Sequence, residues 1–125
     1  MSYTNSLNVH NEWSLPLKGV WVAYNNSTDG TRYFDCLLGA ELPVGEDQAL
    51  PGDITSHDGV ADNWTVTILD SQNRLWATKQ FINENISHDS GSIELTVIGG
   101  NGKPEQVEFR YPSDTNPDFA DLTRV

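Results

Sequence analysis

Two histidine–carboxylate pairs, His57-Asp58 and His88-Asp89, are the residues best suited to acid–base chemistry in this chain. A histidine titrates near neutral pH, and a carboxylate can orient its ring for proton transfer. Neighbours in sequence rarely have the geometry to pair in this way. We therefore interpret these residues, together with Asp62, as candidates for ligand binding.

A calcium site is the second candidate. Asp114, Asn116 and Asp118 place three oxygen-bearing side chains at alternate positions, so a turning backbone could direct them at one ion. Phe119 stands where an EF-hand loop requires glycine, and no glutamate follows at the loop's last position. Calcium is thus the one candidate cofactor, and the alternative is a solvated acidic segment.

A hydrolase would also need an activated nucleophile. Cys36 is the single cysteine, and its apolar neighbours Phe34, Leu37 and Leu38 are typical of a small core residue. The chain contains no G-x-S-x-G, H-E-x-x-H or C-x-x-C motif and no phosphate-binding loop. We therefore predict that the protein is not an enzyme. A lone cysteine excludes an internal disulfide, which favours a cytoplasmic location.

Aromatic side chains offer a different chemistry, because they can stack on sugar rings as well as fill a core. The chain has four Trp and four Tyr. Trp64 alternates in phase with Val66 and Ile68, so it is expected in the core. Trp13, at the end of a strand, and Tyr33, after a polar loop, are the candidate exposed contacts for a ligand.

Length and charge narrow the classes of function. The 125 residues suit one domain, and 18 acidic against 7 basic residues give a net charge of −11. This charge repels nucleic-acid phosphates and anionic lipid headgroups, so neither is an expected partner. No apolar run approaches the length of a transmembrane segment.

Apolar residues at every second position indicate half-buried strands in segment after segment. We predict an all-β fold, an antiparallel β-sandwich of about seven to eight strands of the Ig-like or Greek-key type. A small β-barrel is the alternative. The prediction is one domain over residues 1–125 with 112–125 as a tail, and its clearest strands are 5–11, 20–24, 63–69, 74–82, 92–98 and 105–111.

Turn residues join these strands into hairpins. The polar segment 70–73 links 63–69 to 74–82, and Gly99-Gly100-Asn101-Gly102 links 92–98 to 105–111. The long connection 39–62 is functional, crosses between sheets, or contains a short strand near Asp53–His57.

Strand parity then predicts which loops share an end of the sandwich. If strands alternate in direction, loops 14–17, 39–62 and 83–91 and the tail lie at one end of the sandwich. The loops at 25–31, 70–73 and 99–103 lie at the other end. The first end would collect the candidate ligand-binding histidines and carboxylates, on the longest loops.

Several short segments between residues 5 and 111 follow a shared strand pattern. They are Val9-His10-Asn11 with Pro16-Leu17, Val20-Trp21-Val22, Pro43-Val44-Gly45, Asp62-Asn63-Trp64-Thr65-Val66-Thr67, and Ile93–Val97 with Val107–Phe109. This pattern resembles the URD domain, a small β-sandwich module of fungal and nematode proteins. The resemblance implies the fold and a lipid or cell-surface ligand, and it implies no catalytic residues.

Three functions compete on these observations. The first is a non-enzymatic binding module that recognises a carbohydrate, a lipid headgroup or another surface ligand through loops at one end of the sandwich. The second is an acidic protein-interaction or structural component that docks a basic partner. The third is a small hydrolase or metalloenzyme. Self-association is a further expectation if strand 5–11 or 105–111 is an unprotected edge.

Overall fold

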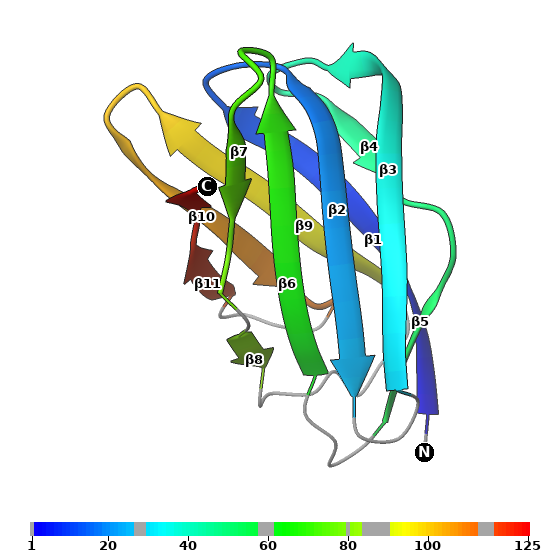
Figure 1. Cartoon of the computed structure of the whole chain (residues 1–125). Coiled ribbons are helices and arrows are strands. Elements are labelled where there is room, and N and C mark those ends of the chain that lie inside the picture. The colour runs from blue at the N-terminus through cyan, green and yellow to red at the C-terminus, as the bar shows by residue number, and fades with distance from the viewer. Residues whose placement is uncertain (1, 27–29, 58–61, 80, 84–90, 113–116) are drawn as a thin grey trace.

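The protein folds as two β-sheets packed face to face (Figure 1). The computed structural model describes residues 2–26, 30–57, 62–79, 81–83, 91–112 and 117–125. Sheet A has the order β11 (Asp118–Asp121), β10 (Lys103–Arg110), β9 (Gly91–Gly100), β1 (Ser2–Trp13) and β4 (Asp47–Ala49), and β5 (Ile54–His57) also pairs with β1. Sheet B has the order β12 (Thr123–Arg124), β7 (Leu75–Ala77), β6 (Asp62–Asp70), β2 (Leu17–Asn26) and β3 (Gly30–Leu42), and β8 (Phe81–Asn83) also pairs with β6.

The predicted β-sandwich is confirmed, and the sheets are open, so the alternative of a closed barrel is wrong. Among the described residues no helix is long and apolar enough to cross a membrane.

Alternating burial builds the core, as the sequence predicts. Along β6 every second residue is buried, and Trp64 is at the centre of the contact between the sheets. Its ring centroid lies 4.6 Å from that of Tyr24 in sheet B and 4.5 Å from that of Phe109 in sheet A. Because these rings come from both sheets, their packing holds the two layers together.

One strand pair departs from the antiparallel pattern. β1 and β9 run parallel, in a register that extends from Asn5 opposite Gly91 to Trp13 opposite Gly99. Parallel neighbours need a crossover connection, and here the chain between them passes through sheet B before it returns. The two predicted hairpins are confirmed as β6–β7 and β9–β10.

The long connection 39–62 contains two short strands, β4 and β5, and the second confirms the predicted strand near Asp53–His57. Together they carry the chain back along sheet A, and so they reverse the direction predicted for every later strand. The turns at 14–16, 43–46, 71–74 and 101–102 therefore share one end, and His57 and Asp62 lie at the other (Figure 1). The prediction that loop 14–17 shares an end with His57 is wrong, because it holds only without a strand near Asp53–His57.

The C-terminal segment, predicted as a tail, adds a strand to each sheet. β11 pairs with β10 and β12 pairs with β7. Leu122 is buried between these strands, and its backbone N–H donates to the carbonyl of Glu105 at 2.9 Å. The condition set for self-association is not met, because β1 lies between β9 and β4, and β10 lies between β9 and β11.

Replacing Leu122 tests whether this segment is part of the core. We expect Leu122→Ala to lower the free energy of unfolding by about 2 kcal/mol, because it removes buried apolar volume. The control is Phe119→Ala on the preceding strand, where the side chain is 52% exposed, and we expect a change within about 0.5 kcal/mol. Urea unfolding measures both variants. Equal losses in the two would contradict this description of the segment.

Candidate binding site

A groove of about 410 Å³ lies at the end of β1, on the side of sheet A. It is lined by three separate segments: His10–Ser14, the turn with Val44 and Gly45, and the β9–β10 hairpin with Gly99–Asn101 and Lys103. The site therefore belongs to the end of the sandwich that carries the short turns, opposite His57 and Asp62.

Turn chemistry fixes the two outer walls of the groove. Asn101 and Gly102 have φ values of 52° and 83°, as a two-residue hairpin turn between β9 and β10 requires. In the turn at 43–46, Gly45 has a φ of 85° and the Glu46 N–H donates to the Pro43 carbonyl at 3.1 Å. Glycine adopts such positive φ values without strain.

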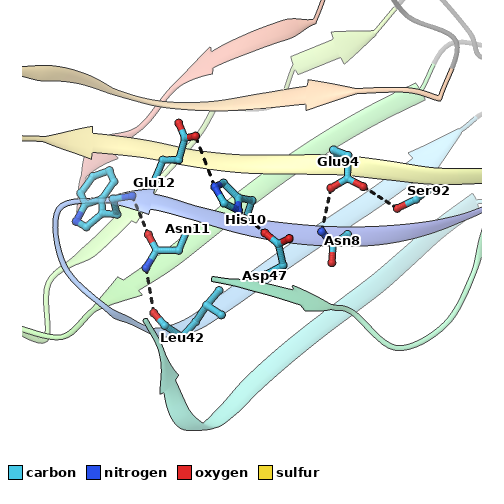
Figure 2. A network of polar contacts seen from close by, with 9 residues as sticks. Asn8, His10, Asn11, Glu12, Leu42, Asp47, Ser92 and Glu94 are labelled. Atoms are coloured by element: carbon cyan, nitrogen blue, oxygen red, sulfur yellow. Dashed lines mark hydrogen bonds and ion pairs between the residues drawn. The ribbon is translucent and has the colours of Figure 1, made fainter. Parts of the chain in front are cut away.

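The buried side chain of Asn11 ties the groove segments together (Figure 2). Its Nδ2 donates to the carbonyls of Leu15 at 3.1 Å and Leu42 at 3.0 Å, and its Oδ1 accepts from the Trp13 N–H at 2.7 Å. Its backbone carbonyl accepts from the Gly45 N–H at 2.7 Å, and its backbone N–H donates to the Glu46 carbonyl at 3.0 Å. One amide thus positions the end of β1 and the turn at 43–46.

Trp13 forms the floor of the groove and is only 2% exposed, so the prediction of an exposed contact is wrong. The physical reason is Gly99, its partner across the parallel pair. A Cβ at Gly99 would lie 2.4 Å from the Trp13 ring, so only glycine lets the ring lie against this strand. On its other side Trp13 meets Trp76 edge to face, with centroids 5.1 Å apart.

Asp70 anchors the turn behind this floor. Its carboxylate accepts from the N–H groups of Gln72 and Arg74, from Arg74 Nε at 3.0 Å and from Trp76 Nε1 at 3.2 Å. Burial alone would raise the pKa of Asp70, but these hydrogen bonds outweigh it and hold the pKa below its ordinary value. The ionised carboxylate thus orients Trp76 against Trp13.

A histidine between two carboxylates stands beside the groove (Figure 2). His10 Nδ1 contacts Asp47 Oδ1 on β4, and His10 Nε2 lies 3.5 Å from Glu12 Oε1. Glu94 on β9 is engaged elsewhere, since it accepts from Asn8 Nδ2 at 2.9 Å and from Ser92 Oγ at 3.0 Å. Of these groups, His10 and Glu12 line the groove itself.

Apart from Trp13, which lines the groove, the sequence-predicted ligand residues lie elsewhere or outside the described residues. His57 ends β5 at the far end of the sandwich, and Tyr33 is placed in β3 opposite Ala23, where only the backbone is described. Asp58, His88 and Asp89 fall outside the described residues.

Asp62, predicted to contact a ligand, is instead fully buried. Its carboxylate accepts from the hydroxyls of Tyr24 and Tyr111, the latter at 2.6 Å, and Trp64 Nε1 donates to the Tyr111 oxygen at 3.2 Å. Burial raises the pKa of Asp62 above its ordinary value, against the lowering effect of the two tyrosine hydroxyls and the charge of His57. Burial and the nearby carboxylate also raise the pKa of Tyr111, which therefore stays a donor. This is a structural polar cluster within the core.

The predicted calcium ligands are described only in part. Asp118 begins β11 opposite Phe109, whereas Asp114 and Asn116 lie outside the described residues. Within the part of the chain that the structure describes, no group of three or more His, Cys, Asp and Glu side chains is arranged to hold a metal ion.

Sequence reasoning named Trp13 but missed the other residues that line the groove. Alternation along β1 does place His10 and Glu12 on the polar face, which is the signal that could have found them. The position of Asp47 carries no such signal, because β4 is a three-residue strand with every side chain exposed.

Comparison with protein families and curated proteins identified no relative of this chain. No protein-family model matches the chain, and no curated protein is significantly similar to it. The resemblance to the URD domain therefore stays a prediction.

The two buried carboxylates give opposite pH dependences of stability. The folded pKa of Asp62 is raised, so the folded state binds this proton more tightly than the unfolded state does, and the stability that Asp62 contributes falls as pH rises through its folded pKa. We expect the unfolding free energy of the wild type, minus that of Asp62→Asn, to decrease from about pH 3 to pH 7.

The matched control is Asp70→Asn, because the folded pKa of Asp70 is lowered. Its contribution is present above the ordinary carboxyl pKa and is lost as pH falls through the folded value, so the same difference should increase with pH. Urea unfolding over this pH series measures both. Slopes of the same sign for the two variants would refute the assignment.

Proposed function

We propose that this protein is a non-enzymatic binding module that takes a carbohydrate into the groove at the end of β1. The observation that carries the proposal is the groove itself, whose volume of about 410 Å³ falls in the range of small-ligand sites. Its walls are short turns, and the turn at 43–46 is held by the hydrogen bonds of Asn11. A site that is already ordered does not lose loop entropy when a ligand binds.

The chemistry of the lining supports a hydroxyl-rich ligand. A sugar hydroxyl both donates and accepts, so its recognition needs both kinds of partner. Glu12 supplies an acceptor, Lys103 supplies donors, and the amide of Asn101 supplies both. Val44, 52% exposed on the rim, offers apolar surface to the C–H face of a ring.

Charge favours a carbohydrate over a lipid headgroup. The net charge of −11 opposes the approach of a phosphate, and Glu12 stands in the groove itself. Within the described groove lining, the nitrogens of His10 face the carboxylates of Asp47 and Glu12 and not the hydroxyl of Ser14. This arrangement favours binding over catalysis. We also propose a cytoplasmic location, supported by the single cysteine.

A glycan array followed by calorimetric titration of the best ligand tests the proposal. We expect Asn101→Gly to weaken binding about tenfold, because it removes one pair of hydrogen bonds while glycine keeps the positive φ of the turn. The matched control is Asn73→Gly, since Asn73 also has a positive φ, of 62°, in a turn at the same end but outside the groove. An array without any bound glycan, or equal weakening in both variants, would overturn the proposal.

A further inference from the structure

The contacts of His10 depend on its state of protonation. Its side chain is 30% exposed, and each ring nitrogen faces a carboxylate: Nδ1 faces Asp47 and Nε2 faces Glu12 (Figure 2). An imidazolium carries an N–H on both nitrogens and so can donate to both carboxylates. A neutral imidazole carries one N–H, which leaves a lone pair facing the other carboxylate. Histidine is the side chain that changes between these states from about pH 5 to pH 8.

Two of the other charged groups on this face already have partners, whereas Lys103 lines the same groove as His10 and Glu12. Glu94 from β9 is held by Asn8 and Ser92, and Glu108 from β10 lies 3.5 Å from Arg110. The residue of β9 directly opposite His10 is Thr96, which is uncharged. Asp47 and Glu12 are therefore the two carboxylates in contact with the His10 ring.

Asp47 connects this contact to the rim of the groove. It is the first residue of β4 and follows the turn at 43–46 directly. β4 has three exposed residues, so little apolar burial holds it to β1. The rim is also attached to β1 by the backbone hydrogen bonds of Asn11, from Gly45 N–H and to Glu46 O, and by the bond from Asn11 Nδ2 to Leu42 O. The contact of His10 with Asp47 therefore helps to fix the position of Val44 and Gly45, which line the groove.

We propose that His10 is a proton-operated latch of the groove. When protonated, it bridges Asp47 and Glu12, fixes the rim at 43–46, and orients Glu12 with its second oxygen left for a ligand. When neutral, it releases one of the two carboxylates, and the rim loosens. This regulation rests on the proposed function, and it means that carbohydrate binding strengthens as the pH falls from about 8 to about 5.5.

The latch can be measured without a ligand. Amide hydrogen exchange at Gly45, corrected for the intrinsic exchange rate, reports on the hydrogen bond from the rim to Asn11. We expect roughly threefold greater protection at about pH 5.5 than at about pH 8, the size expected for a partly exposed ion pair. His10→Gln, which stays neutral, should show no pH dependence. The matched control His57→Gln, at the far end of the sandwich, should keep it.

Binding of the glycan selected on the array is then titrated at both pH values in the wild type and in His10→Gln. A roughly threefold tighter binding at the lower pH in the wild type alone supports the latch. Protection or affinity that does not change with pH, or that changes equally in His10→Gln, overturns it and leaves the proposed function standing if Asn101→Gly still weakens binding. Protection that depends on pH without any glycan binding supports the latch and overturns the proposed function.

Discussion

The parallel pairing of β1 with β9 is the constraint on which both the core and the groove depend. Side chains alternate between the faces of a sheet, so a slip of one residue in this pair would turn Leu7 and Val9 away from the core. The same slip would move the Trp13 ring from Gly99, where no Cβ obstructs it. Burial of the core and placement of the groove floor therefore require one and the same register.

Buried polar groups then order the two ends of the sandwich. Burying an amide or a carboxylate costs free energy unless the group is hydrogen-bonded. The surrounding chain must therefore place donors or acceptors around each such group. Asn11 imposes the positions of the turns at one end, and Asp70 does the same for the turn behind Trp76. At the other end Asp62 accepts hydrogen bonds from Tyr24 on β2 of sheet B and from Tyr111, which follows β10 of sheet A.

Features of the fold that depend on residues close together in the sequence could be predicted, and contacts between residues far apart in the sequence could not. The alternation of apolar and polar residues predicted strands such as β6. Turn glycines predicted hairpins such as β9–β10. The strand near Asp53–His57 was one of three alternatives for the 39–62 connection, and the parity prediction was made without it, so the direction of every later strand was reversed. The burial of Trp13 depends on Gly99, which is remote in sequence and becomes its neighbour only through the parallel pair. The groove as a whole was missed because its three lining segments are remote in sequence and meet only in the folded chain.

Long loops are the usual place to expect a binding surface, yet the groove here is built on short turns. The difference matters for affinity, because ordering a flexible side chain on binding costs about 0.5–1.5 kcal/mol. The turns at 43–46 and 101–102 are set by positive-φ glycines, and the first is also held by the buried amide of Asn11, so they are ordered before a ligand arrives. What the proposed latch adds to these ordered turns is the contact of His10 with Asp47, at the start of β4. The groove lining also contains Glu12 and Lys103, so the proposed binding involves more than one ionisable side chain.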